Sequence, residues 1–379
     1  MQIHLVTEGE NVDTIAQSYG IPAELLIFDN QLVYPYKLAL GQALYIPTYG
    51  PAGERPQIQV SGYAYPYISP WVLGQTLPYI TELPIFSYGF TYEGQLIPPV
   101  LEENWMIEMC RENAVIPFLT LTPLDADGRF NNELITSVVW DTSAGDRLIL
   151  EVAGVMQKKG YGGLDIDFEY IRREDRDSFT EFVRRAAAVM HGFGYKISIA
   201  LAPKTSAEQK GLLYEGKDYG ALGALTDSVL LMTYEWGYKY GPNMAVAPIN
   251  KVEQVVRYAL TEIPSGKLRL GIPNYGYDWP LPVVSNVTTA NTIGNVEAVQ
   301  IAIAHSAQIL YDETAQSPYF RYWQDDVEHE VWFEDVRSLQ AKFQLVKEYG
   351  LQGMGWWQIM RWWRASWLAM EDNFWNGKG

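Results

Sequence analysis

The chain has 379 residues, 48% of them hydrophobic, which is enough for one large folded domain and a small one. Its formal net charge of -17 argues against a nucleic-acid partner, because binding a phosphate backbone needs basic surfaces. The single cysteine, Cys110, excludes an internal disulfide framework, and no apolar run is long enough to span a bilayer.

The first 48 residues predict a small module of two strands and two helices. Residues 1–6 have no basic leader and no apolar run of signal-peptide length, so we expect no signal peptide. A short strand at residues 4–6 is followed by an apolar stripe from Val12 to Tyr19, which indicates a helix that ends at Gly20. A second helix begins at Pro22, and residues 41–47 close the module with a second strand.

This module resembles the LysM family. The matching positions are Val6, Gly9, Ile15, Ala16, Leu26, Asn30, Leu40, Gly41, Gln42, Leu44, Ile46 and Pro47. The first loop departs from the family pattern, with Glu10, Asn11 and Val12 where the family usually has Asp-Thr-Leu. The resemblance implies binding to glycans that contain N-acetylglucosamine, such as peptidoglycan or chitin. A docking domain without sugar affinity is the alternative.

The rest of the chain predicts an α/β barrel behind a linker. Residues 49–56 are rich in Gly and Pro and mark the boundary, and residues 57–379 alternate short apolar runs with helical segments. The connection at about 279–334 is too long for a simple loop and predicts a small α+β insertion. The predicted strands reach the number that closes a (β/α)8 TIM barrel, at residues 58–64, 84–90, 115–121, 161–170, 196–202, 228–234, 268–275 and 353–359.

The predicted strand at residues 161–170 reads Y-G-G-L-D-I-D-F-E-Y. Its period of two places Asp165, Asp167 and Glu169 on one face, about 6.6 Å apart, so three carboxyl groups can reach one small ligand. Like charges at this spacing ionise together only at high cost, so at least one carboxyl should keep a proton near neutral pH and serve as a general acid. The alternative is a solvated strand with one wet face, which a central position in a parallel barrel disfavours.

The D-I-D-F-E run resembles the last three acids of the D-x-x-D-x-D-x-E motif of family 18 glycoside hydrolases, the chitinase-like enzymes. Gly162 stands at the position of the first acid, but the chemistry of the family is attributed to the last two. The resemblance implies retaining hydrolysis in which the acetamido oxygen of the sugar is the nucleophile. Glu169 would protonate the leaving oxygen and later deprotonate water, Asp167 would hold the acetamide N–H, and Asp165 would tune Asp167.

The same resemblance indicates further site residues at the ends of other strands. Tyr234, in M-T-Y-E, would hydrogen-bond the acetamido oxygen, and Trp357 would form the floor of the subsite, with Trp356 as the alternative. Further candidates for substrate contacts are Glu235, Tyr275 and Met232. The four histidines are scattered and no nucleotide-binding motif is present, so we expect neither a metal nor a cofactor.

We therefore expect a monomeric glycosidase that cleaves N-acetylglucosaminyl bonds and is brought to its polymer by the LysM-like module. The module together with L-D-I-D-F-E-Y-I, M-T-Y-E-W-G and V-W-F-E-D-V-R-S resembles the cortex-lytic N-acetylglucosaminidases of spore germination, which implies a place in the spore coat or cortex. Three alternatives stay open: a chitinase, an endo-N-acetylglucosaminidase acting on other glycans, and a non-catalytic lectin. A location in the cell wall or outside the cell is the alternative to the spore.

Overall fold

The computed structural model describes residues 1–48, 55–284 and 286–378, so most of the predicted linker lies outside the described residues. The N-terminal unit pairs β1 (Gln2–Leu5) with β2 (Ala43–Ile46) in an antiparallel ladder. Between them lie α1 (Val12–Tyr19) and α2 (Ala23–Asp29). The Asn11 side chain accepts a hydrogen bond from the Thr14 amide at 3.0 Å and so caps α1, as its residue type favours.

The large domain is a closed parallel barrel, and the predicted fold class is confirmed. In the sheet order β3-β16-β10-β9-β8-β7-β6-β4, the first strand also pairs with the last and closes the ring. The barrel strands are β3 (Gln59–Gly62), β4 (Glu82–Phe90), β6 (Ile116–Leu121), β7 (Gly163–Ile166), β8 (Lys196–Leu201), β9 (Ser228–Leu231), β10 (Leu268–Pro273) and β16 (Gly353–Trp357). A short strand, β5 (Leu96–Ile97), extends the sheet beside β4.

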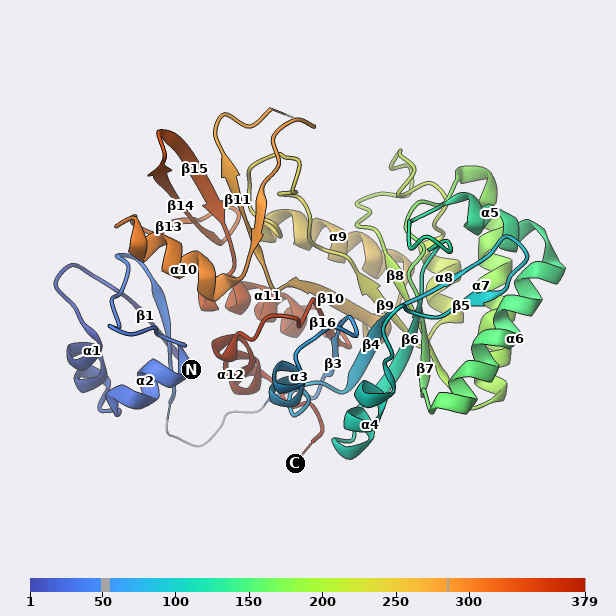
Figure 1. Cartoon of the computed structure of the whole chain (residues 1–379), viewed down its shortest axis with the longest axis horizontal. Coiled ribbons are helices and arrows are strands. Elements are labelled where there is room, and N and C mark those ends of the chain that lie inside the picture. The colour runs from blue at the N-terminus through green and yellow to red at the C-terminus, as the bar shows by residue number, and fades with distance from the viewer. Residues whose placement is uncertain (49–54, 285, 379) are drawn as a thin grey trace.

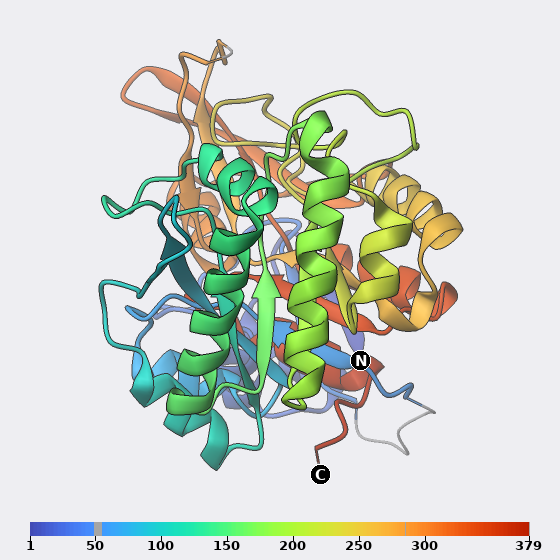
Figure 2. The same cartoon turned by 90° about the vertical axis from the view of Figure 1, so that its right-hand side faces the viewer.

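Helices cover the outside of this ring, and Figure 2 shows α6 and α7 on either side of β7. Their apolar faces pack on the strands, as with the Phe179, Phe182 and Val183 stripe of α7. The helices are α3 (Pro70–Thr76), α4 (Asn104–Glu112), α5 (Glu133–Trp140), α6 (Thr142–Lys159), α7 (Arg176–Gly192), α8 (Tyr219–Leu225), α9 (Ile249–Glu262), α11 (Val336–Glu348) and α12 (Arg364–Asn373). Among residues 1–48, 55–284 and 286–378, every helix is too short or too polar to serve as a membrane span.

A five-stranded antiparallel sheet with one helix rises between β10 and α11 (Figure 1). Its order is β12-β11-β15-β14-β13, and its elements are β11 (Gly276–Pro280), β12 (Asn291–Ile293), α10 (Asn295–Ala304), β13 (Leu310–Asp312), β14 (Ser317–Gln324) and β15 (Val327–Trp332). The sequence pattern predicted a small α+β insertion here, at about 279–334, and the structure confirms it. The pattern did not separate β11 from the barrel strand before it, because only Asn274 and Tyr275 lie between them.

The N-terminal unit is packed against the rest of the molecule, beside α12 and α10 in Figure 1. Arg364 Nε pairs with the Asp29 carboxylate at 2.9 Å, and the Tyr45 hydroxyl donates to Asp372 at 2.8 Å. On the insertion side, the Ile309 amide donates to the Leu40 carbonyl at 2.9 Å. These contacts hold the small domain on both the barrel and the insertion.

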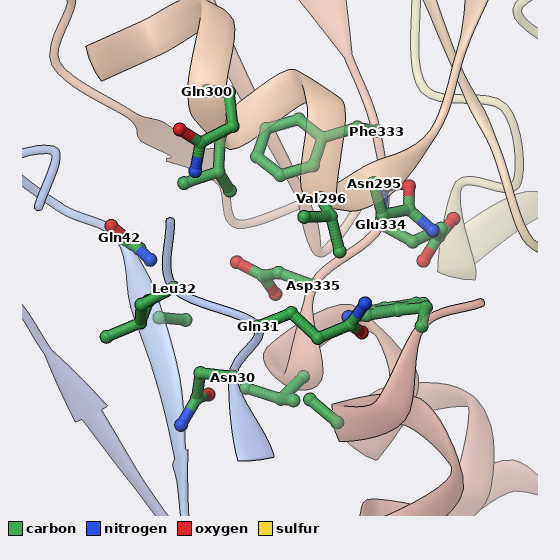
Figure 3. A pocket seen from close by; sticks show the side chains of 15 residues that line it. Asn30, Gln31, Leu32, Gln42, Asn295, Val296, Gln300, Phe333, Glu334 and Asp335 are labelled. Atoms are coloured by element: carbon green, nitrogen blue, oxygen red, sulfur yellow. Dashed lines mark hydrogen bonds between the residues drawn. The ribbon is translucent and has the colours of Figure 1, made fainter. Parts of the chain in front are cut away.

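Glycine is required at one point of this interface. Gly41 has φ +79°, and a Cβ added there would lie 2.1 Å from the Ile309 carbonyl oxygen. A cavity of about 40 Å³ remains between the three parts (Figure 3). The small domain contributes Leu32 and Gln42 to its wall, and the insertion contributes Val296 and Gln300. The close backbone approach at Gly41 therefore leaves only a small void beside it.

A buried ion group lies inside the barrel near the N-terminal ends of its strands. Glu82, Lys196 and Arg269 come from β4, β8 and β10, which are not neighbours in the sheet, so their side chains meet across the interior. Arg269 Nη2 donates to Glu82 at 3.1 Å, and Lys196 Nζ donates to it at 3.3 Å. Burial alone would raise the pKa of Glu82, but the charges and hydrogen bonds of Arg269 and Lys196 outweigh burial and lower it.

We predict that Arg269→Met lowers the free energy of unfolding by about 3–5 kcal/mol, because it leaves Glu82 buried with only the partly exposed Lys196 to balance it. Adding Glu82→Gln should restore part of this loss by removing the stranded charge. Urea unfolding of the single and double variants measures both effects. Arg184→Met, which removes an exposed partner of Glu181, is the control and should cost about 0–1 kcal/mol. A single Arg269 variant as stable as this control would contradict the prediction.

Candidate active site

The acidic row begins in β7 and continues beyond it. The strand ends at Ile166, earlier than the predicted end at residue 170, because its neighbour β6 ends at Leu121 and offers no further ladder. The Asp167 amide still donates to the Leu121 carbonyl at 3.0 Å, so the chain stays extended at this point. Asp167 and Glu169 thus stand at the C-terminal rim of the barrel, where working residues of this architecture lie.

The three acids differ in their access to solvent. Asp165 is fully buried, and the Ser198 hydroxyl donates to its Oδ1 at 2.5 Å. Asp167 is 6% exposed, whereas Glu169 is more exposed and lines an open cleft. Within the described part of the chain, Asp165 Oδ2 and Asp167 Oδ1 have no hydrogen-bond partner. The row therefore leads from the barrel interior into the cleft.

The environment raises the pKa of every carboxyl in this row. Burial raises the pKa of Asp165 to about 6, although the Ser198 hydrogen bond opposes it. For Asp167, burial and then the negative charges of Glu169 and Asp165 raise the pKa well above its ordinary value. Burial also raises the pKa of Glu169, against the opposing positive charge of Lys217. These directions favour proton retention within the row, as expected from the spacing of the acids.

The cleft has a volume of about 490 Å³ and brings together most of the predicted site residues. Those that line it are Asp167, Glu169, Met232, Tyr234, Glu235 and Trp357. Its wall also includes aromatic side chains that the sequence analysis did not single out, which are Tyr63, Tyr170, Tyr214, Trp236 and Tyr238. Flat rings beside hydrogen-bonding edges suit a saccharide. Asp165 and Tyr275 lie behind the surface of this cleft.

Trp357, and not Trp356, faces the cleft. The Trp357 ring packs edge-on against Phe86 and Tyr63, with centroids 5.0 and 5.7 Å away. Trp356 points to the outside of the barrel, where it is fully buried with its ring centroid 4.8 Å from that of Trp367. Alternation along β16 turns neighbouring side chains to opposite faces, so only one of the two rings can form the floor.

Tyr275 holds Glu235 instead of lining the cleft. The Tyr275 hydroxyl donates to Glu235, and the Tyr277 hydroxyl donates to the same carboxyl at 3.0 Å. Burial raises the pKa of Glu235 to about 7, although both tyrosines oppose this by donating to the ionised form. Tyr277 belongs to β11, a strand that the sequence pattern did not reveal, so its role could not be anticipated.

Two further residues were missed. Asn274, just after β10, donates from its amide nitrogen to the carbonyls of Gln358 at 3.0 Å and Arg361 at 2.9 Å, and so fixes the segment that follows Trp357. Tyr63 follows β3 directly and stands at the barrel rim. An aromatic residue at a strand end was the signal that could have found Tyr63, whereas Asn274 carries no such signal in the sequence.

Comparisons with known proteins place this site in a family. The model of glycosyl hydrolases family 18 matches residues 128–361, which is more than half of the chain. The chain belongs to this family. The LysM domain model matches residues 4–47, so the N-terminal unit is a LysM domain. The family 18 match spans β7, β9, β10 and β16, which carry the predicted site residues at their ends.

Similar proteins align over almost the whole length. The chain is 38% identical to the cortical fragment-lytic enzyme of Bacillus subtilis, with 99% of this chain and 98% of that protein covered. It is 34% identical to the protein of the same name from Bacillus cereus, with the same coverage. The crystal structure of the spore cortex-lytic enzyme SleL from Bacillus megaterium superposes with a TM-score of 0.94 at 31% identity, covering 100% of this chain and 99% of that one.

We predict that Asp165→Asn stabilises the family 18 fold at neutral pH. The pKa of Asp165 is raised on folding, so its contribution to stability is complete below about pH 4 and is lost as pH rises through about 6. A displacement from 3.8 to about 6 corresponds to about 3 kcal/mol, which the Asn variant should gain at pH 7 and lose again at pH 4.

Urea unfolding at pH 4 and pH 7 measures this difference. Asp127→Asn is the matched control, because Asp127 is exposed and does not line the cleft. An Asp165→Asn variant that is no more stable than the wild type at pH 7 would contradict the burial penalty.

Proposed function

We propose that this family 18 glycosidase hydrolyses N-acetylglucosaminyl bonds of peptidoglycan, with spore cortex as its polymer and the spore coat or cortex as its place of action. The observation that carries the proposal is the buried acidic row that opens through Glu169 into an aromatic cleft. The polymer is supported by near-complete alignment with proteins named cortical fragment-lytic enzymes.

The proposed reaction begins with the proton on Glu169. Glu169 gives it to the glycosidic oxygen as the bond from that oxygen to the anomeric carbon breaks, and the acetamido oxygen of the same sugar bonds to the anomeric carbon. The sugar becomes a cyclic oxazolinium ion, and the leaving saccharide departs with the proton. Asp167 accepts the hydrogen bond of the acetamide N–H, and the Tyr234 hydroxyl donates to the acetamido oxygen. Glu169 is left as a carboxylate.

The second step returns the proton. Water attacks the anomeric carbon from the side that the leaving group vacated, and Glu169 takes one of its protons as the ring bond to the acetamido oxygen breaks. The configuration of the product is therefore retained. Asp165 lies behind Asp167 and touches no substrate, so its role is to share a proton with Asp167 and to keep that carboxyl oriented.

The LysM domain contributes binding to the same polymer in this proposal. Trp357 forms the floor for the sugar that reacts, and Glu235 and Met232 supply further contacts at the wall. A binding protein without activity would not need a protonated carboxyl at the surface of its groove. The raised pKa of Glu169 therefore favours the hydrolase over the lectin.

We predict that Glu169→Gln lowers the release of reducing ends from cortex peptidoglycan by at least about 100-fold, because the amide cannot donate a proton to the leaving oxygen. Cosedimentation with the polymer should stay unchanged. Glu174→Gln is the control, since Glu174 is exposed in the helical turn that follows the site. Hydrolysis by the Glu169 variant at the rate of this control would reject the acid assignment.

We also predict that the first products carry N-acetylglucosamine at their reducing end in the β configuration. Mass spectrometry of digests of cortex peptidoglycan, vegetative peptidoglycan and chitin identifies the bond and the preferred polymer. Proton NMR during the first turnovers records the anomer before it equilibrates. An α product would contradict substrate assistance, and preferred cleavage of chitin would contradict the proposed polymer.

A further inference from the structure

Lys217 is a buried cation that the mechanism above does not use. It lies between β8 and α8, is 1% exposed, and is among the largest fully buried side chains. Among the residues that the structure describes, its Nζ has no hydrogen-bond partner and no carboxylate oxygen within 4.0 Å. A buried ammonium in that state costs several kcal/mol unless opposite charges nearby compensate it.

The backbone around Lys217 is fixed against the segment that carries Glu169. A Cβ added to Gly216 would lie 2.4 Å from the Ile171 carbonyl oxygen and 2.7 Å from that of Arg172, so the two segments are in close backbone contact. Lys204 Nζ donates to the Lys217 carbonyl at 3.2 Å. The Lys217 amide donates to the carbonyl of Tyr214, which lines the cleft, at 3.2 Å. The backbone position from which the Lys217 side chain starts is therefore fixed by these contacts.

The opposite charges that act on Lys217 are those of the acidic row. Burial lowers its pKa to about 8, and the negative charges of Glu169 and then Asp167 oppose this, while the positive charge of Lys204 reinforces it. Lys217 is thus mostly cationic at neutral pH. The other buried lysines differ, because Lys342 pairs with Glu334 at 2.8 Å and Lys204 holds a carbonyl. Among these three, only Lys217 lacks a direct hydrogen-bond partner within the described residues, and its opposing charges are the acids of the site.

We propose that Lys217 is a positioning residue of the hydrolytic reaction, the buried counter-charge that stabilises Glu169 as a carboxylate after it has given up its proton. This inference rests on the proposed function of the cleft. When the first step is complete, Glu169 is an anion beside Asp165 and Asp167, which share one proton and carry negative charge between them. A cation behind them lowers the energy of that state and makes Glu169 a stronger acid toward the leaving oxygen.

The inference predicts a displaced pH profile. The alkaline limb of kcat/KM reports loss of the proton from the general acid, and an opposite charge nearby lowers that apparent pKa. Lys217→Met removes the charge while keeping the length of the side chain, so the limb should move to higher pH by about one unit. The rates are measured as reducing ends released from a soluble peptidoglycan fragment across the pH range in which the wild type stays folded.

Two further variants separate charge from structure. Lys217→Arg keeps the charge, so its alkaline limb should stay at the wild-type position. Lys342→Met removes a buried lysine whose charge is neutralised by Glu334 and does not act on the acidic row, so any loss of rate should be equal across the pH range. A Lys217→Met profile that is lowered at every pH without displacement would overturn the inference, as would an Arg variant displaced like the Met variant.

Folding and activity are checked independently. Near-ultraviolet circular dichroism verifies that each variant is folded, and Lys217→Gln replaces the Met variant if that one is not. If both neutral variants unfold, the alkaline limb of the Lys217→Arg profile is the test. A displaced limb contradicts the assignment, and a limb at the wild-type position supports it. A wild type that releases no reducing ends refutes the proposed function, whereas an active wild type with an unmoved neutral-variant profile refutes only the role of Lys217.

Discussion

Three carboxyl groups lie close together in a row, two of them buried and the third at the wall of the cleft, and the rest of the site is organised by the mutual repulsion of their charges. Asp165 is fixed by Ser198 on the adjacent strand, and Asp167 still follows the extended backbone beyond β7. Neither can move away from the other without breaking the ladder that holds the barrel together. The repulsion between the carboxylates is therefore relieved by keeping a proton in the row. The row is suited to passing that proton to a ligand in the cleft.

The two ends of the barrel treat buried charge in opposite ways. At the N-terminal end, Glu82 is matched by Arg269 and Lys196 through direct hydrogen bonds, so its charge is neutralised locally. At the C-terminal end, the acids outnumber the cation near them, and the ammonium of Lys217 touches none of them directly. The first arrangement favours a stable fold. The second arrangement keeps the pKa values of the acidic row raised and a proton available for transfer. In this barrel architecture, stability and reactivity are thus provided at opposite ends.

The sequence was sufficient for the features that depend on periodicity. The alternation around Asp165, Asp167 and Glu169 predicted a strand with its acids on one face, and the repeated apolar runs predicted the barrel. The sequence was insufficient where contacts between segments far apart in the chain place a side chain. Tyr275 and Tyr277 meet Glu235 only because the chain bends between β10 and β11, and no periodic pattern records that bend.

Lys217 shows the same limit from another direction. A lysine in a connection between a strand and a helix is normally assigned to the surface, since a buried ammonium is rare. Its burial follows from the close approach of Gly216 to the carbonyls after Glu169, which is a relation between segments far apart in the chain.

Trp356 and Trp357 were predicted in part from the sequence pattern and in part only from the structure. Alternation required that one ring face inward, and only the placement of β16 in the ring determined which.

The docking of the small domain changes what it contributes to the enzyme. Through Arg364 and Asp29, Tyr45 and Asp372, and the close passage at Gly41, it is joined to the barrel as part of one body. A binding module on a flexible linker samples a volume around its attachment point, and the length of the linker sets the effective concentration that the module provides. The docked domain is instead held in one position relative to the barrel. A glycan bound to the small domain would reach the cleft at one distance and one angle. The spacing of the sugar repeat along that glycan would then determine which of its glycosidic bonds lies in the cleft.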